Sequence, residues 1–328
     1  MNWSNTRVLV TGAGGFIGSH LCERLVNLGA KVRAFVRYTS KSSHGCLELL
    51  SPDIYREIEV FLGDIRSIER VRDAVLGVDF IFHLASLIAI PYSYLDPRDY
   101  AETNVLGGLN ILTAAREHQV SKLIMTSTSE VFGTAKYAPI DELHPLQGQS
   151  PYSASKIAID KFAQSFFCSY NLPVVILRPF NTYGPRQSAR AIIPTIISQA
   201  LSGNQLKLGS LHPTRDFTFV KDTAEGFILA AEKGVNGEDY NIGNGKEISV
   251  KMLVEQIGKL LGKSLTVIQQ EERVRPLNSE VERLTANPQK AKTVLGWEPK
   301  ITLEQGLKQT IVWIQEQKHL YKTEVYTI

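Results

Sequence analysis

A glycine-rich turn directly after a short β-branched run is the feature that most constrains how this chain folds. Arg7–Val10 (RVLV) predict a strand, and the amphipathic residues 19–28 predict a helix. Gly12, Gly15 and Gly18 lie between them with G-x-x-G-x-x-G spacing. Glycines there permit a tight turn and close backbone approach to a pyrophosphate, for which the helix N-terminus supplies N–H donors. The strand–turn–helix context therefore favours a dinucleotide site over a purely structural turn.

Further apolar runs alternate with helical patterns, which predicts a parallel sheet covered on both faces. The runs occupy residues 31–36, 59–62, 80–85, 122–126 and 174–177, and helical patterns include 105–118 and 153–170. We therefore expect an α/β fold with a Rossmann-type doubly wound parallel sheet. Because the alternation loosens after Pro179, we expect a smaller C-terminal α/β substrate-binding domain. The predicted dinucleotide-binding domain spans 1–180, with 217–242 returning to it, and the substrate-binding domain spans 181–216 and 243–328.

Composition excludes several classes of function. The 328 residues suit one large domain and a smaller one. The net charge is only +3, without Lys or Arg runs, so neither nucleic acid nor a membrane surface is expected as a partner. The three cysteines are odd in number and have no metal-binding spacing, so we expect reduced thiols and no metal site. A polar N-terminus and the absence of long apolar stretches predict a cytoplasmic protein.

The end of the second predicted strand bears on the choice of cofactor. A carboxylate that binds the ribose 2′-hydroxyl is expected there, but the sequence reads Phe35-Val36-Arg37. A cation at Arg37 favours the 2′-phosphate of NADP(H); the alternative is a solvated arginine with NAD held by backbone contacts. Asp64, just after the third strand, is a candidate for contacting the adenine or for capping a helix.

The segment Ser150–Lys156 (SPYSASK) predicts the start of a helix that carries catalytic chemistry. Ser150 can cap the helix and Pro151 suits its first turn. Tyr152 and Lys156 are four residues apart and therefore face the same side. An ammonium near a phenol lowers the pKa of the phenol, which can then accept a proton from a sugar hydroxyl. Thr128 follows the fifth strand, at the edge where ligands bind in such sheets, and could bond the same hydroxyl.

Seven motifs occur along the chain in this order: TGAGGFIG, GDI, HLA, TSTSEVFG, YSASK, RPFNTYGPR and RDFTFV. With them, essentially the whole chain resembles the extended short-chain dehydrogenases/reductases of the nucleotide-sugar epimerase/dehydratase family. The resemblance implies a tightly bound, recycled NAD(P) and a catalytic triad of Thr128, Tyr152 and Lys156. We also expect cofactor contacts at Tyr152 and Lys156 and at other residues of these motifs: Phe16, Ile17, Ile65, Leu84 and Ala85.

Members of this family differ in the reaction that follows oxidation at sugar C4. Glu130 lies where 4,6-dehydratases carry the base that removes the C5 proton, whereas a simple epimerase needs no carboxylate there. Many dehydratases have an aspartate at the position of Ser129, so the proton for the leaving hydroxyl would come from water or from Glu130. Uronic-acid decarboxylases also carry a Thr-Ser-Glu motif, which leaves decarboxylation open. A non-catalytic dinucleotide-binding protein would be expected to lack the Tyr or the Lys.

Longer segments resemble the N-acetylglucosamine-type 4,6-dehydratases of legionaminic acid biosynthesis; they include residues 83–94, 141–156, 178–195, 211–217 and 275–284. The resemblance implies a nucleotide-sugar substrate, with UDP and GDP both open, and a homodimer in which helices 105–118 and 153–170 pair. Phosphate recognition favours arginine. The substrate-binding candidates are Asn181, Arg186, Arg215 and Arg275, with Arg190 a weaker one.

Overall fold

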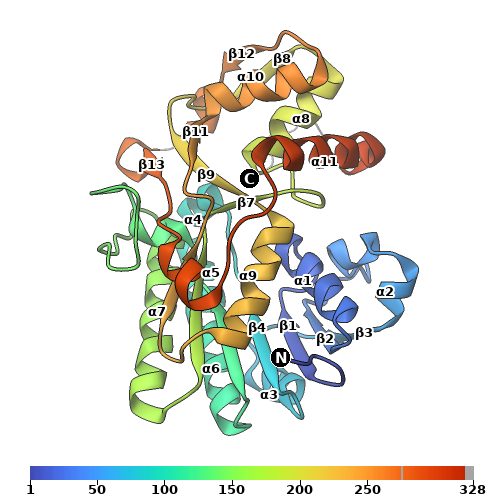
Figure 1. Ribbon diagram of the computed structural model, residues 1–328, viewed down its shortest axis with the longest axis vertical. Coiled ribbons are helices and arrows are strands. Elements are labelled where there is room, and N and C mark those ends of the chain that lie inside the picture. The colour runs from blue at the N-terminus through green and yellow to red at the C-terminus, as the bar shows by residue number, and fades with distance from the viewer. Residues whose placement is uncertain (275, 322–328) are drawn as a thin grey trace.

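A parallel sheet of seven strands forms the larger half of the computed structural model, which describes residues 1–274 and 276–321 (Figure 1). Across the sheet the strands are β3 (Ile58–Leu62), β2 (Lys31–Val36), β1 (Arg7–Thr11), β4 (Phe80–His83), β5 (Lys122–Thr126), β6 (Val174–Pro179) and β10 (Asp239–Ile242). All neighbouring pairs run parallel. The order reverses between β1 and β4, where open α/β sheets bind their ligands. The predicted Rossmann-type doubly wound sheet is confirmed.

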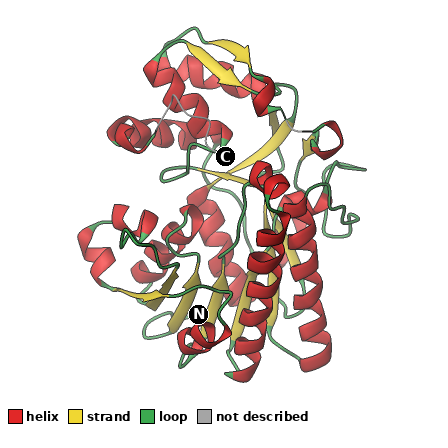
Figure 2. Ribbon diagram, turned by 180° about the vertical axis from the view of Figure 1, so that it is seen from behind, coloured by secondary structure: helices red, strands yellow, loops and turns green. Residues whose placement is uncertain are grey.

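Two layers of helices cover the sheet, because successive side chains of each strand point to opposite faces. Val8 and Val10 of β1 lie in the hydrophobic core on one face and Leu9 in the core on the other. The first core includes residues of α1 (Phe16–Asn27) and α9 (Val220–Lys233). The second includes residues of α3 (Ile68–Val75), α6 (Gly107–Glu117) and α7 (Pro151–Tyr170), and Figure 2 shows the long α6 and α7 in front of the strands. The strands are thus buried on both faces, as their continuous apolar runs predict.

A second group of elements lies beyond the carboxyl ends of the sheet strands (Figure 1). Its strands are β7 (Asn181–Tyr183), β8 (Gln205–Leu208), β9 (Thr214–Phe219), β11 (Glu247–Ser249), β12 (Thr266–Gln269) and β13 (Arg283–Leu284). Its helices are α8 (Ile192–Ser202), α10 (Val250–Leu261) and α11 (Leu303–Glu316). β9 pairs with β7, β11 and β13, while β8 pairs with β12. These helices and strands enclose a separate core.

Residues 217–242, expected to return to the first domain, belong to both groups. Phe217–Phe219 lie in β9 of the second sheet, so the expectation is wrong for this part of the segment. Phe217 and Phe219 pack in the core of the second group. The rest of the segment does return to the first domain: α9 packs against α1, and β10 pairs with β6 of the seven-stranded sheet. The other domain boundaries remain predictions.

Short helical segments complete the described chain. They are α2 (Pro52–Arg56), α4 (Ile90–Leu95), α5 (Pro97–Tyr100), the π-helical turn η2 (Ala101–Leu106), a second such turn η6 (Ala291–Leu295), and the 3₁₀ turns η1 (Gly45–Leu49), η3 (Ser129–Phe132), η4 (Glu271–Arg273), η5 (Leu277–Ser279) and η7 (Lys318–Leu320). Within residues 1–274 and 276–321, no helix combines the length and the hydrophobicity needed to cross a bilayer.

Candidate active site

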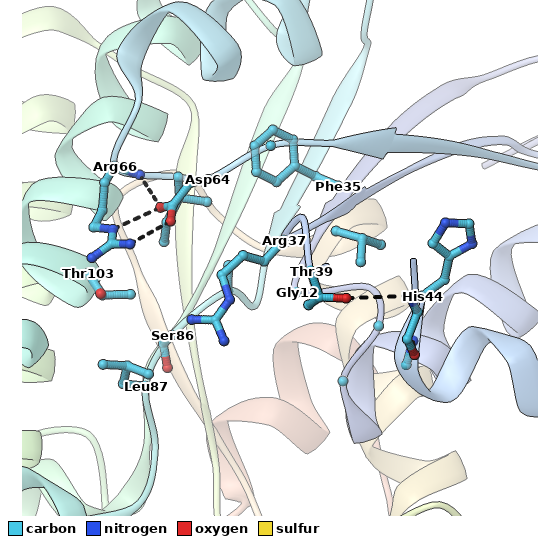
Figure 3. Close-up of a pocket in the computed structure, with 18 residues that line it drawn as sticks. Gly12, Phe35, Arg37, Thr39, His44, Asp64, Arg66, Ser86, Leu87 and Thr103 are labelled. Carbon is cyan, nitrogen blue, oxygen red and sulfur yellow. Dashed lines mark hydrogen bonds and ion pairs between the residues drawn. The ribbon is translucent and has the colours of Figure 1, made fainter. Parts of the chain in front are cut away.

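A pocket of about 360 Å³ opens at the carboxyl ends of β1, β2 and β3, where the first βα turn meets the loops that follow the neighbouring strands (Figure 3). Six of the predicted cofactor residues line it: Gly12, Gly15, Arg37, Asp64, Ile65 and Ala85. Phe16, Ile17 and Gly18 begin α1 beside it, and Leu84 precedes Ala85, but these four are not among its lining residues.

The glycines of this turn fit a bound dinucleotide. Gly12 has a φ of +68°, and a Cβ there would lie 2.7 Å from the backbone nitrogen of Ala85. A Cβ on Gly18 would collide with the carbonyl oxygen of Gly12. The chain therefore passes close to β4 and packs α1 tightly against the turn. Gly15 is the N-cap of α1 and makes no side-chain capping bond, which leaves N–H groups of the first turn available to a ligand.

Arg37 and Asp64 both line this pocket (Figure 3). Arg37 is exposed and forms no salt bridge within the described part of the chain. Asp64 pairs with Arg66 at 2.7 Å, and this hydrogen bond is the main reason that the pKa of Asp64 is lowered. Ser67, not Asp64, caps α3 by accepting the N–H of Arg70. The helix-capping alternative for Asp64 is therefore wrong, and its carboxylate lines the pocket.

The loop after β2 contributes pocket residues that the sequence reasoning missed. Thr39, Ser43, His44 and Gly45 all line the pocket, and the loop is held against the glycine turn because Cys46 N–H donates to Gly14 O at 2.8 Å. No local pattern distinguishes these residues from an ordinary solvent-exposed loop. Their position depends on a contact between segments that are distant in the sequence.

The predicted catalytic pair lies on the first turns of α7. Ser150 and Ser153 form a reciprocal capping box and Pro151 occupies the first turn, as expected. Tyr152 and Lys156 are both buried, with 7% and 3% of their surfaces exposed. Lys156 Nζ donates to the carbonyl oxygen of Thr126 at 2.5 Å, which fixes the ammonium against the end of β5.

The loop after β5 brings Thr128 and Glu130 to the same place. Thr128 caps η3, and its side chain lies close enough to Tyr152 to lower the pKa of the phenol. The carboxylate of Glu130 is close enough to Tyr152 to raise the pKa of the phenol. Ser129, between them, is buried with 3% exposed surface. The structure therefore gathers Thr128, Ser129, Glu130, Tyr152 and Lys156 in one site.

Burial dominates the electrostatics of this site. Desolvation raises the pKa of Tyr152, and the neighbouring side chain of Thr128 acts in the opposite direction. Burial lowers the pKa of Lys156 to about 8. It also lowers the pKa of His83 to about 3, with the nearby charge of Lys156 adding to the effect. His83 is therefore neutral at physiological pH, and its Nδ1 lies 2.7 Å from Thr11 Oγ1. This agrees with a packing role for His83 rather than an acid–base role.

Tyr100 is an aromatic neighbour of the site that sequence reasoning missed. Its ring meets that of Tyr152 edge-on at 6.2 Å, and its hydroxyl donates to Ala89 O. Tyr92 packs against Tyr100 at 6.2 Å and is 36% exposed. Tyr94 instead lies 2.6 Å from Ser279 Oγ and so connects the α4 segment to residues beyond β12.

The predicted substrate anchors lie in different surroundings. Asn181, at the start of β7, has a buried Oδ1 with no hydrogen-bond partner among the described residues, as suits a ligand contact. Arg215 is 8% exposed and pairs with Glu280 at 3.3 Å. Arg186 contacts His20 and Glu23 on α1, on the cofactor side of the molecule. Arg275 lies outside the described residues. The roles of all four remain predictions.

Comparisons with known proteins cover nearly the whole chain. Residues 9–310 match the family described as GDP-mannose 4,6 dehydratase. The chain is 32% identical to the human dTDP-D-glucose 4,6-dehydratase over 96% of its length and 92% of that protein. The chain belongs to the nucleotide-sugar epimerase/dehydratase family of extended short-chain dehydrogenases/reductases. The predicted family is thereby confirmed.

Relatives within this family differ in the reactions that they catalyse. The chain is 33% identical to a UDP-N-acetyl-α-D-glucosaminuronate decarboxylase of Bacillus cytotoxicus, covering 94% of this chain and 98% of that protein. The solved structure of DesIV, a dTDP-glucose 4,6-dehydratase of Streptomyces venezuelae with NAD and TYD bound, aligns with a TM-score of 0.87 at 29% identity, covering 97% and 99% of the two chains. Family membership and the glycine turn together support NAD(P) as the cofactor of the pocket.

Proposed function

We propose that this chain is a nucleoside-diphosphate-sugar 4,6-dehydratase that converts UDP- or GDP-N-acetylglucosamine to the 4-keto-6-deoxy sugar. Its place in legionaminic acid biosynthesis is part of the proposal and rests on the sequence resemblance. The observation that carries the reaction type is the carboxylate of Glu130 beside the hydroxyls of Thr128 and Tyr152. A dehydratase needs such a base within reach of the sugar carbon next to the oxidised one.

Oxidation at C4 begins with removal of the hydroxyl proton. Tyr152 accepts that proton, and Thr128, whose side chain lies beside the same phenol, orients the sugar hydroxyl. Lys156, held on the end of β5, places a positive charge one helical turn away and so favours the phenolate. When bound, the nicotinamide supplies the hydride acceptor for C4 and the hydride donor for C6.

Water elimination requires a base at C5 and a proton at the C6 hydroxyl. Glu130 removes the C5 proton, which the adjacent 4-keto group makes acidic. The C6–O bond then breaks, and the proton held by Glu130 leaves with the hydroxyl as water. A proton returns to C5 from Tyr152 or from solvent, so the site regains its starting protonation. Ser129, a buried hydroxyl and a poor acid, takes no proton-transfer role in this scheme.

The fate of the C5 hydrogen tests this scheme directly. A reaction run in deuterium oxide should yield a 4-keto-6-deoxy product that carries deuterium at C5, detected by NMR. A product that retains the substrate hydrogen at C5 would contradict proton removal by Glu130.

Uronic-acid decarboxylation is the second candidate, because the B. cytotoxicus decarboxylase is a close match over nearly the full length of both chains. That activity would release carbon dioxide from a nucleotide uronic acid instead of water from a hexosamine. A 4-epimerase would need neither the Glu130 base nor loss of any group. Product mass distinguishes the three, since an epimer has the mass of its substrate.

We propose NADP(H) as the preferred cofactor, because Arg37 lies at the end of β2 and lines the pocket with no salt-bridge partner in the described part of the chain. The end of β2 is where the adenine ribose is recognised in dinucleotide-binding folds. The solved structure of DesIV has NAD bound, so a preference for NADP(H) would distinguish this chain from that relative.

We also propose a homodimer that pairs α6 and α7 with their copies. Large apolar side chains are exposed along this side of the molecule: Leu106 at 54%, Phe162 at 40% and Tyr170 at 52%. Burying them against a second copy would give these helices two apolar faces, one toward the sheet and one toward the partner.

A further inference from the structure

Beneath the catalytic pair lies a fully buried carboxylate to which the scheme above assigns no part. Asp160 has no exposed surface and follows Lys156 by four residues on α7, so both residues face the same side of the helix. Its Oδ2 accepts the hydroxyl of Ser127 at 2.7 Å and two guanidinium hydrogen bonds from Arg178 at 3.3 Å. Its Oδ1 accepts no hydrogen bond from the described residues.

A buried anion of this kind is costly unless nearby cations compensate for it. Arg178, on β6, is 1% exposed and pairs with Asp239 of β10 as well as with Asp160. Asp239 also pairs with Lys290 at 3.6 Å, whereas Asp160 shares its surroundings with the buried Lys156. Burial raises the pKa of Asp160 and the nearby charge of Lys156 acts to lower it, while Asp160 in turn raises the pKa of Lys156.

The hydrogen bond to Ser127 connects the same carboxylate to the active-site loop. Ser127 follows β5 directly and precedes Thr128, and its own N–H donates to Leu177 O at 2.8 Å. Asp160 thus ties α7, which carries Tyr152 and Lys156, to the strand end that carries Thr128.

We infer that Asp160 is a positioning residue: it keeps the ammonium of Lys156 charged and, through Ser127, holds Thr128 in register with Tyr152. This inference rests on the proposed function only in giving Lys156 and Thr128 their roles beside Tyr152. The other groups around Lys156 are the neutral His83 of β4, the carbonyl oxygen of Thr126 on β5 and Tyr152 on α7. Asp160 is therefore the anion that acts on Lys156.

Asp160→Asn tests the inference, with Asp239→Asn as its matched control. Both variants remove a carboxylate from Arg178, but Asp239 lies on the edge strand and is not among the groups that shift the pKa of Lys156. In protein carrying isotope-labelled lysine, NMR titration should give a Lys156 pKa lower by about one unit or more in Asp160→Asn. Asp239→Asn should leave that pKa close to the wild-type value. Equal Lys156 pKa values in wild type and Asp160→Asn would overturn the inference.

Kinetics supply the second readout. The pH above which turnover falls should move lower in Asp160→Asn and stay in place in Asp239→Asn. Ser127→Ala, which keeps all charges, should reduce kcat with little change in KM and no movement of this limb. An unchanged kcat in Ser127→Ala would overturn the link to Thr128. Should Asp160→Asn fail to fold, Ser127→Ala still tests the link to Thr128, and Asp160→Glu, which keeps the carboxylate, tests the charge on Lys156: it should leave the Lys156 pKa close to the wild-type value, and a Lys156 pKa lowered by about one unit or more would overturn this part of the inference. Absence of turnover in the wild type would instead refute the proposed function, whereas the NMR titration of Lys156 would still stand.

Discussion

The side chain of Thr128, in the loop after β5, lies beside the phenol of Tyr152 on the first turn of α7, close enough to lower the pKa of that phenol. This contact joins two segments that are separated in the sequence by a long loop, and it places a second hydroxyl beside the proposed general base. Removal of the phenolic hydroxyl should disable proton transfer while the buried ring stays in place.

Tyr152→Phe keeps the ring and its edge-on contact with Tyr100. We expect turnover to fall by about 10²–10⁴, the usual contribution of general acid–base catalysis. Steady-state kinetics measure the loss, and an unchanged melting temperature would show that the fold is intact. Near-normal turnover would exclude the phenol as the base.

Glu130→Gln should block elimination while leaving C4 oxidation possible, because Gln has the shape of Glu but cannot accept the C5 proton. The backbone N–H of residue 130 would still donate to Thr128 Oγ1. We expect the absorbance of reduced nicotinamide to build up without release of water. Ser129→Ala is the matched control and should still eliminate water. Unimpaired elimination by Glu130→Gln would rule out Glu130 as the C5 base.

Activity should fall as the pH rises above about 8, because burial lowers the pKa of Lys156 to about 8. The sign follows from the charge: below this pKa the ammonium is present and favours the phenolate of Tyr152, and above it the charge is lost. The pH dependence of kcat/KM reports groups of the free enzyme and checks this. A rate that stays constant well above pH 8 would show that the charge on Lys156 is not required.

Arg37→Gln should weaken NADP⁺ binding by about tenfold or more, the range expected for a lost charge-assisted hydrogen bond, and should leave NAD⁺ binding nearly unchanged. Calorimetry with both cofactors measures the two dissociation constants. Arg66→Gln is the control, since Arg66 lines the same pocket but is paired with Asp64. A clear preference of the wild type for NAD⁺ would refute the role given to Arg37.

Phe162→Glu should convert a dimer into a monomer, because a charge would replace an exposed aromatic ring on α7 within the proposed interface. Light scattering at micromolar concentration measures the mass. Met252→Glu, at a 58% exposed site on α10, is the control and should remain dimeric. A wild-type protein that is already monomeric would exclude the dimer.

The features that could be predicted from sequence are those in which local pattern and tertiary structure agree. The β-branched runs became buried parallel strands because both faces of the sheet are covered, and the glycine turn lies where a Cβ would collide with the backbone. The helix that carries Tyr152 begins as expected, since its capping box is a local interaction.

The features that escaped prediction depend on contacts between distant segments. Tyr100 reaches Tyr152 through the packing of α5 on α7, and the loop after β2 joins the pocket because Cys46 bonds Gly14. Phe217 and Phe219 belong to the segment that we expect to return to the first domain. They instead pair with β7 and pack in the core of the second group. The buried Asp160–Arg178 pair joins α7 to β6, and no spacing rule indicates it.

The central claim is that this site removes water from a nucleotide-linked N-acetylglucosamine. The most direct test is mass spectrometry of the product after purified protein is incubated, without added cofactor, with UDP- or GDP-N-acetylglucosamine. The account predicts that one of the two yields a product lighter by one water molecule, which would also name the nucleotide and show that the bound cofactor is recycled. If both sugars keep their mass, or only a nucleotide uronic acid reacts, with loss of carbon dioxide, the dehydratase assignment is contradicted.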